Sequence, residues 1–541
     1  MFSIDQNSHS LWDALPKLQA LAAAGHAVTH YIEDIDVAFT WLGAHVDGDG
    51  LRLARERFHR SGGEDWGAAL FYCQFLSRLP VEIRDWEPYT GLSTAALAHQ
   101  LERTVDDLYD EFSPSDNWQL IGPSYIGDRD HHRTVGDLTT AECAPFVREI
   151  LAKARADTLG AFPQADCRKR ANEWFDDERR RLDSLLEQSP PRLVDLYRLW
   201  LSDLLRGTSV KLDETSNLFA IDGERMDLLE LFTADYARMA GLYNQALDET
   251  RVGLRRLRVE RGELPFFAAY THHGHAVRSP VHLDGRQVVT GDMRFTLDGD
   301  GRLPRREMSA AGIRCLAGKA ILLVIQARGG PRGQPLALPY RGSMYMPASH
   351  RFLAHIRQTA GRLPAIQPVF RVRFRFLDRL RGLDTVICLP PHIRGYFGRT
   401  EVPARELGEN WQAISDQARR RLESFRDAAF RKRWQEEAFA DIASEIATLD
   451  ARRRELAAVD PKGADFLEKR RVWKDIKLRK TVMLDGLLRQ IAADWQARDI
   501  DHWDSRGALL PWSVALGGKA FYDDLIANAQ IYEERSNDCG L

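Results

Sequence analysis

Apolar residues recur every three or four positions along most of the last quarter of the chain. Between residues 410 and 458 they form one stripe, with charged side chains on the other faces, and residues 467–495 carry a second stripe. The letters DPKG at residues 460–463 separate the two. Two amphipathic helices joined by a Pro-Gly turn predict an antiparallel coiled-coil hairpin over residues 404–498. Its first helix would have about fifty residues and a length of roughly 70 Å.

Short apolar runs bounded by turn residues predict strands ahead of that hairpin. Four such runs are Trp118–Gly127, Leu264–Tyr270, Lys319–Ala327 and Leu383–Pro391. The pair Asp284–Gly285, between polar and β-branched residues, predicts a hairpin turn. Residues 1–115 and 141–258 carry helical patterns instead. Strands that alternate with helices predict an α/β fold with a Rossmann-like core and a largely parallel sheet.

These patterns divide the chain into three parts. Residues 1–403 would form the α/β core with helical insertions, and residues 404–498 would form the coiled-coil hairpin. Residues 499–541 are too apolar to be disordered, so we expect this last segment to return and pack against the core.

The charge balance and the cysteine spacing limit the partners and the cellular compartment that the sequence allows. Lys and Arg number 75 and Asp and Glu 78, so no global positive field attracts nucleic acid or an anionic membrane. The start of the chain lacks a basic region followed by an unbroken apolar run, and no apolar stretch is long enough to span a bilayer. The six cysteines are far apart and form no CxxC pair, which fits reduced thiols. We therefore expect a cytoplasmic protein that binds neither nucleic acid nor a membrane.

Two stretches near the C-terminus point to a known family. Residues 455–491 (ELAAVDPKGADFLEKRRVWKDIKLRKTVMLDGLLRQI) and 509–525 (LLPWSVALGGKAFYDDL) resemble the bacillithiol-biosynthesis cysteine-adding enzymes, a family of cysteine ligases. Weaker similarity covers Leu338–Ile356, and Asp130 and His131 match an Asp-His pair of that family. The chain departs from the family pattern because it lacks the N-terminal Gly-Gln-Gln motif. The resemblance implies the fold more directly than the substrate.

The segment Ile126–Val135 (IGDRDHHRTV) is the first candidate site. It follows a predicted strand, and ligands of open α/β sheets bind at the carboxyl ends of strands. A general base needs one histidine with a carboxylate to orient it, which His131 and Asp130 could supply, with Asp128 nearby. The alternative is that these side chains cap a helix and solvate a loop. We predict His131, Asp130 and Asp128 as catalytic residues.

Glycine and arginine gather after the apolar run that ends at Ala327. The sequences RGGPRG and PYRGS place Arg328, Arg332 and Arg341 where they could pair with the oxygens of a phosphate. Ser343 and Tyr345 follow, and we include both as candidate substrate-binding residues. Ser343 lacks the flanking glycines of a nucleophile elbow and is not expected to react covalently. A glycine-rich turn with solvated arginines would give the same pattern.

A second histidine cluster, THHGHAVRSPVH, offers His272, His273 and His275 as candidate metal ligands. His272 and His275 have ligand-like spacing, and His273 and His275 would share one face of a strand. No cysteine completes the ligand set, and the first acidic residue downstream is Asp284. A polar loop that enters a hairpin is the competing explanation.

The leading hypothesis is an enzyme of thiol biosynthesis, similar to the cysteine ligases, that forms an amide (C–N) bond. It would join an amino acid or thiol-bearing acid to an amine on a small molecule such as an amino sugar. A nucleotide is a candidate cofactor, a divalent metal is less expected, and the coiled coil would form a homodimer. Two alternatives stay open: a metal-dependent hydrolase or transferase that uses the histidine clusters, and a non-catalytic coiled-coil scaffold.

Overall fold

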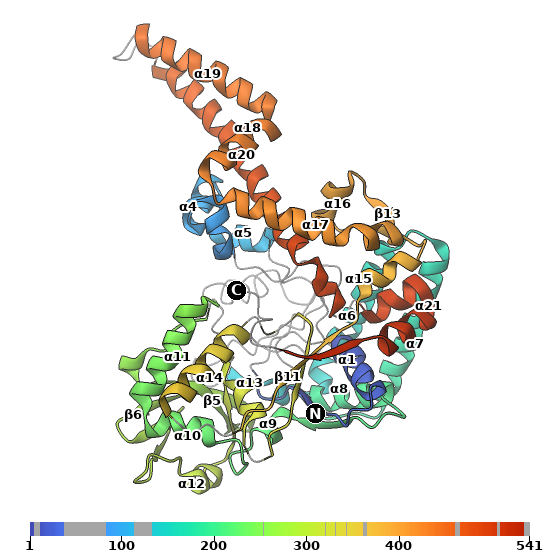
Figure 1. Ribbon diagram of the computed structural model, residues 1–541, viewed down its shortest axis with the longest axis vertical. Helices are drawn as coiled ribbons and strands as arrows, with labels where there is room; N and C mark the ends of the chain where they lie inside the picture. The colour runs from blue at the N-terminus through green and yellow to red at the C-terminus, as the bar shows by residue number, and fades with distance from the viewer. Residues whose placement is uncertain are drawn as a thin grey trace. The chain divides into compact units, whose positions relative to one another are not determined.

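A computed structural model describes most of the chain, as two compact units (Figure 1). The described residues are 1–4, 11–36, 83–112, 132–252, 254–319, 321–330, 332–341, 343, 345–360, 365–459, 466–505 and 509–534. Residues 1–75, 117–379 and 501–541 form one unit, which we call the sheet unit. Residues 76–116 and 380–500 form the other, the helical unit. The helical unit thus includes residues 76–116, which the sequence patterns had grouped with the α/β core.

The sheet unit contains a largely parallel six-stranded sheet in the order β14-β11-β10-β1-β2-β4. Its strands are β1 (Phe2–Ile4), β2 (Thr29–Ile32), β4 (Lys211–Glu214), β10 (Leu336–Pro339), β11 (Val369–Arg373) and β14 (Gln530–Glu533). All neighbours pair in parallel except β14, which runs antiparallel to β11. From β1 the chain builds the sheet outward through β2 and β4 on one side, and later through β10 and β11 on the other. The order therefore reverses between β1 and β10.

The central strand β1 pairs with a strand that lies more than 300 residues further along the chain. β1 pairs with β10 through Phe2↔Leu336 and Ser3↔Ala337. Strands of three or four residues carry almost no periodic signal, and the helical pattern predicted for residues 1–115 did not anticipate β1 or β2. That part of the prediction is wrong, whereas the expected largely parallel sheet is confirmed.

A second sheet is antiparallel, in the order β8-β7-β6-β5-β9, with β3 added to β6. Its strands are β3 (His132–Arg133), β5 (Glu263–His272), β6 (His275–Asp284), β7 (Gln287–Thr290), β8 (Met293–Thr296) and β9 (Ile313–Gly318). The predicted strand at 264–270 and the turn at Asp284–Gly285 are both confirmed. Gly285 has a φ of 59°, a conformation that suits glycine in a tight hairpin.

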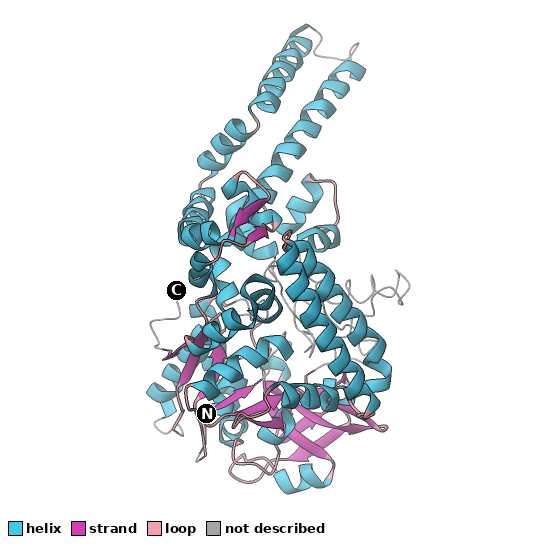
Figure 2. Ribbon diagram, turned by 90° about the vertical axis from the view of Figure 1, so that its right-hand side faces the viewer, coloured by secondary structure: helices cyan, strands magenta, loops and turns pink. Residues whose placement is uncertain are grey.

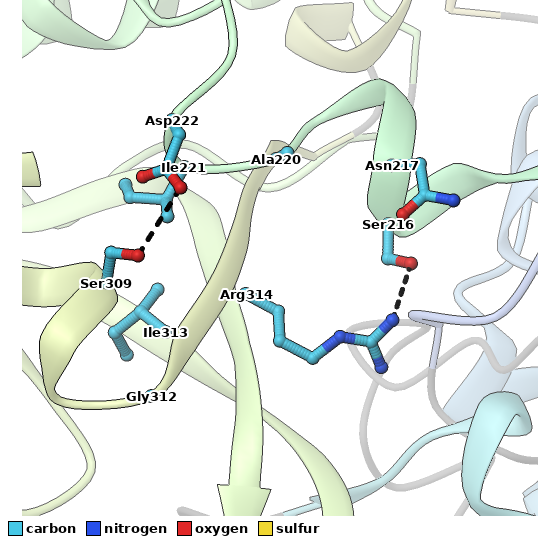
Figure 3. A pocket seen from close by; sticks show the side chains of 9 residues that line it. All are labelled: Ser216, Asn217, Ala220, Ile221, Asp222, Ser309, Gly312, Ile313 and Arg314. Atoms are coloured by element: carbon cyan, nitrogen blue, oxygen red, sulfur yellow. Dashed lines mark hydrogen bonds between the residues drawn. The ribbon is translucent and has the colours of Figure 1, made fainter.

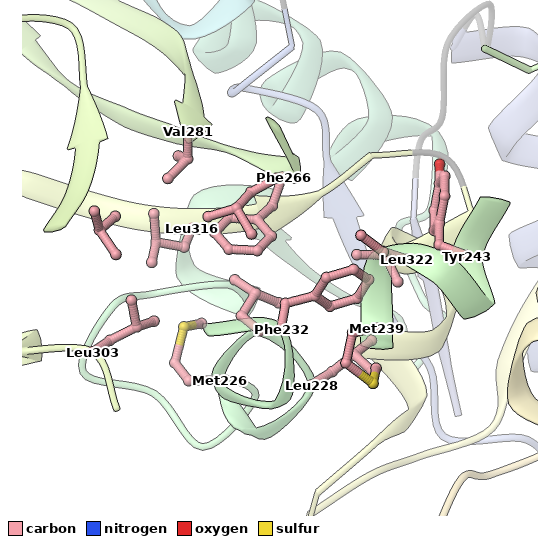
Figure 4. Close-up of a cluster of buried hydrophobic side chains, with 14 of the residues drawn as sticks. Met226, Leu228, Phe232, Met239, Tyr243, Phe266, Val281, Leu303, Leu316 and Leu322 are labelled. Carbon is pink, nitrogen blue, oxygen red and sulfur yellow. The ribbon is translucent and has the colours of Figure 1, made fainter. Parts of the chain in front are cut away.

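Strand β5 of the antiparallel sheet is buried on both faces, which explains its continuous apolar run. Phe266, Ala268 and Tyr270 point to one face, where they pack with the helices α10 (Asp227–Ala234), α11 (Tyr236–Thr250) and α14 (Met346–Ala360). Figure 4 shows Phe232 of α10 directed toward Phe266. Phe267 and Ala269 point to the other face and pack with residues of β1, β10 and β11. The two sheets therefore share one apolar core.

Lys319–Ala327 was predicted as a strand and is wrong: Ile321–Arg328 forms helix α13. Periodicity cannot separate a buried strand from a helix that is apolar on all sides. Ile321 and Ile325 belong to the core on one side of α13, and Val324 and Ala327 belong to the core on the other side. The helix is buried all round, which produced the unbroken apolar run.

Leu383–Pro391 contains a strand, but not one of the parallel sheet. Only Val386–Cys388 (β12) is extended, and it pairs antiparallel with β13 (Glu401–Pro403) in a two-stranded sheet of the helical unit. The predicted strand Trp118–Gly127 lies outside the described residues. Further helices of the sheet unit are α1 (Leu11–Ala23), α6 (Thr140–Ala161), α7 (Ala165–Glu187), α8 (Leu193–Leu204), α9 (Thr215–Leu218), α12 (Arg305–Ala310), α15 (Phe376–Arg379) and α21 (Leu509–Ala527).

Side-chain-to-backbone hydrogen bonds fix two of these helices. α6 begins with a capping box, in which Thr139 and Glu142 bond to each other's backbone N–H groups. α21, from the C-terminal segment, packs on α1 and α7, and Arg170 of α7 donates to the carbonyl oxygens of Ala515 and Leu516. In the described residues, no helix is long and apolar enough to cross a membrane.

The helical unit contains the long C-terminal helices, which run side by side in both views (Figures 1 and 2). They are α17 (Ala404–Phe425), α18 (Ala428–Ala438), α19 (Ala440–Val459) and α20 (Phe466–Arg498). Their contacts are antiparallel: Ser415 bonds to Arg498, Arg421 to Asp494, Gln435 to Met483, Glu445 to Arg479 and Arg452 to Glu468. Shorter elements of this unit are α3 (Glu87–Thr90), α4 (Thr94–Gln100), α5 (Val105–Phe112) and α16 (Pro391–Phe397).

The first arm of the predicted hairpin is three helices rather than one of about fifty residues. Asp427 breaks the arm because its side chain accepts from the Ala429 N–H as the N-cap of α18. Phe439, with a φ of −126°, separates α18 from α19. The turn predicted at 460–463 lies outside the described residues.

Candidate functional site at the carboxyl edge of the parallel sheet

Polar side chains gather where the parallel strands end, which we call the carboxyl edge. Glu33–Asp36 follow β2, Thr215–Ser216 follow β4, and Tyr340–Arg341 follow β10. In sheets of this kind, the connections that follow two neighbouring strands diverge where the strand order reverses. Ligands bind in the space between those connections. In this molecule that point lies between β1 and β10, so Arg341 stands beside it.

Arg341 and Tyr340 share one carboxylate at this edge. The Arg341 guanidinium donates to Asp501 from Nε (3.1 Å) and from Nη2 (2.7 Å), and Tyr340 Oη donates to Asp501 Oδ2 (3.0 Å). The Asp501 side chain is 10% exposed, whereas that of Arg341 is 43% exposed. Burial, and then the nearby Asp501 charge, raise the pKa of Tyr340 to about 12, so its hydroxyl remains a donor. One side of the Arg341 guanidinium is thus held while the side chain still reaches solvent.

A second ion pair continues the edge at the end of β11. Arg373 Nε donates to Asp504 Oδ2 (2.8 Å), and its guanidinium lies 4.4 Å from the centre of the Tyr340 ring. Asp504 Oδ1 accepts from the Leu377 N–H (3.1 Å). Burial raises the pKa of the Asp504 carboxyl to about 6, although Arg373 opposes the shift. Asp504 is therefore a group that titrates near neutral pH beside the arginines.

The segment after β2 carries buried carboxyl groups. Glu33 Oε1 accepts from the N–H groups of Ile35 and Asp36 at 2.8 Å each, and Asp34 Oδ1 accepts from the Ser216 N–H at 2.8 Å. Burial raises the pKa of Asp34 to about 6. Burial, with the neighbouring Asp36 and Asp34 charges, raises the pKa of Glu33 as well. Asp34 can therefore hold or accept a proton near neutral pH.

The last residue of the candidate segment Ile126–Val135, and the glycine that follows it, bond to the backbone of two of these acidic residues. The Val135 N–H donates to the Asp36 carbonyl oxygen and the Gly136 N–H to the Asp34 carbonyl oxygen, both at 2.9 Å. A Cβ on Gly136 would stand 2.6 Å from the Asp34 carbonyl oxygen, so only glycine fits this approach. The predicted catalytic residues Asp128, Asp130 and His131 lie outside the described residues.

A pocket of about 280 Å³ lies just beyond β4 (Figure 3). Arg314 and Ser216 line one side, where Arg314 Nη2 donates to Ser216 Oγ (3.0 Å). Asp222 and Ser309 line the other, joined by a hydrogen bond of 3.4 Å. Arg314 Nη2 also lies 3.8 Å from Asp34 Oδ2. The pocket therefore adjoins the carboxyl edge through Asp34 and Ser216, and it offers a cation and hydroxyl groups to a small polar ligand.

The structure does not gather the three predicted phosphate-binding arginines. Arg328 is buried at the end of α13, where it donates to the carbonyl oxygens of Val324 (2.8 Å) and Gln367 (2.9 Å), and burial lowers its pKa to about 10. Arg332 is 83% exposed and lies 3.5 Å from Glu224. Both precede β10, whereas Arg341 follows it, so the length of the strand, roughly 13 Å, separates them.

Ser343 and Tyr345 follow Arg341 on the chain. Ser343 has a φ of 53°, and its carbonyl oxygen accepts from the Met346 N–H (2.9 Å) at the start of α14. Tyr345 is partly buried against the apolar core of the two sheets. Of the predicted binding residues, Arg341, Ser343 and Tyr345 therefore lie together on the connection after β10.

The second histidine cluster forms the β5–β6 turn. His272 pairs with His275 across the turn, and His273 has a φ of 49°. His275 Nδ1 lies 3.0 Å from Asp137 Oδ2. β3 begins at His132 and pairs with β6 through His132↔Arg278, so the end of the first histidine cluster lies beside the strand that begins at His275. No group of three metal-ligating side chains occurs within the described parts of the chain.

Sequence reasoning missed the acids that complete this edge. Asp501 and Asp504 lie in the stretch DHWD, some 160 and 130 residues from the arginines that they bind. Glu33, Asp34 and Asp36 follow the β-branched and aromatic letters THYI, and an acidic run directly after such a segment is the signal that could have located them.

No family model matches this sequence, and no curated protein matches it. The similarity to the cysteine-adding enzymes therefore rests on the quoted stretches of sequence alone.

Proposed function

We propose that the protein is a cytoplasmic enzyme with a Rossmann-like core that binds an anionic small molecule at the carboxyl edge and forms an amide bond there. The observation that carries the proposal is the half-exposed Arg341 at the reversal of strand order between β1 and β10. Arginine is suited to this position because its planar guanidinium pairs bidentately with phosphate or carboxylate oxygens. The amide-forming reaction itself comes from the resemblance to the cysteine ligases.

Amide formation at this edge requires three tasks. A cation must hold the anionic group, and we assign that task to Arg341. The carboxyl substrate must be activated, for which a nucleotide is the candidate co-substrate. A base must take the proton that the attacking amine loses as its nitrogen bonds to the carbonyl carbon and the leaving group departs with its electron pair. His131, oriented by Asp130, is the predicted base, and Asp34 is a second group able to accept that proton because its pKa is about 6.

The test is direct binding of an anionic probe to the full chain. We expect ATP or inorganic pyrophosphate to bind wild-type protein in a calorimetric titration. Arg341→Gln should weaken binding by about 10- to 100-fold, because charge-assisted hydrogen bonds contribute roughly 1.5–3 kcal/mol. Arg332→Gln is the matched control, since Arg332 is exposed and precedes the same strand. Equal affinity of the two variants, or no binding by wild type, would refute the assignment.

The chemistry is tested separately by mass spectrometry. The protein is incubated with ATP, cysteine or other amino acids, and a panel of amino sugars, and the products are searched for a new amide. Loss of product in His131→Ala would support the predicted base, whereas full activity would exclude it. Loss in Asp34→Asn with activity retained in His131→Ala would move the role to Asp34.

The pairing of β3 with β6 favours one second candidate, a metal-dependent hydrolase or transferase. In that pairing His132 and Arg133 stand opposite Arg278 and Val277, on the strand that begins at His275. This alternative predicts zinc, manganese or iron at about one ion per chain in protein as purified, with loss of the metal in His272→Ala/His275→Ala. Metal-free protein that is active would reject it.

A further inference from the structure

The pocket just beyond β4 has two ends that differ in charge. Arg314 and Ser216 lie at one end, and Asp222 and Ser309 lie at the other. Figure 3 shows the Arg314 side chain directed toward Ser216 and away from Asp222. We call the two the cationic end and the anionic end.

Apolar side chains line the pocket between these ends. Ala220 and Ile221 lie between them along one wall, and Ile313 lies between them along the other. The walls are held together because the Ile221 N–H donates to the Arg314 carbonyl oxygen (3.0 Å). A ligand that reaches from one end to the other therefore passes over a hydrocarbon surface.

The Arg314 guanidinium keeps donors for a ligand at the cationic end. Its side chain is 45% exposed, and Nη2 donates one of its two N–H groups to Ser216 Oγ (3.0 Å). Among the described residues, Nε and Nη1 of Arg314 have no hydrogen-bond partner. Since each bidentate edge of a guanidinium combines Nη2 with Nε or with Nη1, one complete edge stays open for a carboxylate.

The charges around the cationic end balance one another. They are three arginines and three acidic residues: Arg192, Arg198, Arg314, Asp34, Asp195 and Glu214. Arg192 binds two of these acids at 2.7 Å each, whereas Arg314 lies 3.8 Å from its nearest carboxylate, that of Asp34. A ligand carboxylate can therefore come closer to Arg314 than these acids do. With Asp34 ionised and Asp222 included, these acids outnumber these arginines by one, so the pocket disfavours a simple anion.

Asp222 is the acceptor at the anionic end. It is exposed, and among the described residues its one hydrogen bond comes from the Ser309 hydroxyl at 3.4 Å. The neighbouring cations Arg225 and Arg305 donate to backbone carbonyl oxygens at 3.1 and 2.9 Å instead. A ligand ammonium can therefore form charge-assisted hydrogen bonds with Asp222.

We propose that this pocket binds a short aliphatic ω-amino acid, with γ-aminobutyrate and δ-aminovalerate as representative compounds. The ligand carboxylate pairs with Arg314, the ammonium pairs with Asp222, and the methylene groups lie on the apolar walls between them. An α-amino acid carries both charges on one carbon atom and reaches only one end. The pocket volume of about 280 Å³ holds roughly nine groups of the size of a water molecule, which suits a chain of this length.

This ligand is not the anion assigned to Arg341. β4 and β10 are three strand spacings apart in the parallel sheet, roughly 14 Å, so the two sites are separate. The inference therefore does not depend on the amide-forming reaction.

The experiment is a ligand-observed NMR titration of the full chain with matched compounds. We expect δ-aminovalerate and γ-aminobutyrate to bind wild type with a Kd of about 1 mM, because both charged ends of the pocket are open to water. Glycine lacks the separation of charges, and valerate and pentylamine each lack one charge, so these three should bind about tenfold or more weakly.

Variants test the two ends one at a time. Arg314→Gln and Asp222→Asn should each weaken the binding of δ-aminovalerate about tenfold or more. The matched controls are Arg294→Gln and Asp292→Asn, at exposed positions of the β7–β8 hairpin, and they should leave the affinity unchanged. Inorganic pyrophosphate should bind Arg314→Gln as it binds wild type.

Each outcome decides the proposal. Absence of δ-aminovalerate binding by wild type overturns it, and so does glycine binding of equal strength; neither result requires a variant. An equal loss in the control variants also overturns it. Loss of pyrophosphate and δ-aminovalerate together in Arg314→Gln, with an unchanged circular dichroism spectrum, would mean that the two ligands share one site and would reject the separate pocket.

Discussion

The molecule builds the same trio of Asp, Arg and Tyr in two regions, with opposite accessibility. In the helical unit, Asp494 accepts from Arg421 Nε (2.6 Å), Arg421 Nη2 (2.5 Å) and Tyr396 Oη (2.5 Å). At the carboxyl edge of the sheet unit, Asp501 accepts from Arg341 and Tyr340 in the same way. The hydrogen bonds between Asp, Arg and Tyr therefore do not distinguish the two sites.

Exposure distinguishes them. The Asp494 side chain is fully buried and Arg421 is 25% exposed, whereas Asp501 is 10% and Arg341 43% exposed. Gln490 also donates to Asp494 (2.8 Å), so the helical trio is closed by protein donors. The comparison indicates that the Asp494 trio, which we call the closed trio, fixes α16, α17 and α20 together. The Asp501 trio, which we call the open trio, holds Arg341 at a place where a ligand can reach it. A charged cluster is evidence for a site only when one member remains open.

The largest expected effect is on the closed trio. Asp494→Ala leaves Arg421 half-buried without its carboxylate, which should cost about 3–5 kcal/mol of unfolding free energy. The Tm of the helical unit should fall by on the order of 10 °C in calorimetry. The exposed Arg419–Asp416 pair provides the control, since Arg419→Ala should change stability by under about 0.5 kcal/mol. Similar losses in the two variants would show that the buried Asp494 trio stabilises the helical unit no more than an exposed ion pair does.

A smaller effect is expected at the open trio. Asp501→Asn removes a negative charge beside Arg341 but leaves that guanidinium able to hydrate, so unfolding free energy should fall by only about 1 kcal/mol. Affinity for inorganic pyrophosphate should rise about threefold to tenfold, because the competing carboxylate charge is lost. Calorimetric titration of the variant beside wild type measures both the sign and the size. Weaker pyrophosphate binding would mean that Asp501 positions Arg341 rather than competing with the ligand.

The smallest effect is a pH dependence next to the open trio. Because burial raises the pKa of Asp504 to about 6, the folded chain holds this proton more tightly than the unfolded chain does. The stability that the folded chain gains from protonated Asp504 is fully present below about pH 4 and is lost as pH rises through 6. The Tm of wild type minus that of Asp504→Asn should therefore fall between pH 4 and pH 7 and stay level above. A difference that rises with pH would show that the Arg373 pair outweighs burial.

Elements with long or regular patterns were predictable from the sequence. The strand at Leu264–Tyr270, the turn at Asp284–Gly285 and the amphipathic stripes of α17 and α20 all follow from local spacing. The central strands were not predictable, because β1 has three residues and pairs with a strand more than 300 positions away. The helix α13 was missed for the opposite reason: burial on every side erased its periodicity.

Only the residues of the candidate site that lie close together in the sequence were predictable. Arg341, Ser343 and Tyr345 stand on one loop, and their grouping follows from the sequence itself. Asp501 and Asp504 enter by tertiary contact alone, so no local pattern connects them to Arg341. Grouping Arg328 with Arg341 failed because β10, which separates them, had not been recognised as a strand.

The position of the helical unit within the chain has a consequence for synthesis on the ribosome. Residues 380–500 are made between Arg373 of β11 and the segment that supplies Asp501, Asp504 and the edge strand β14. At about 5–20 residues per second, translation of that insert leaves β11 as an open sheet edge for roughly 6–24 seconds. Arg341 and Arg373 also lack their carboxylate partners during that interval. Nascent chains stalled before residue 501 should therefore bind chaperones that capture exposed strands, and release them once the last forty residues emerge.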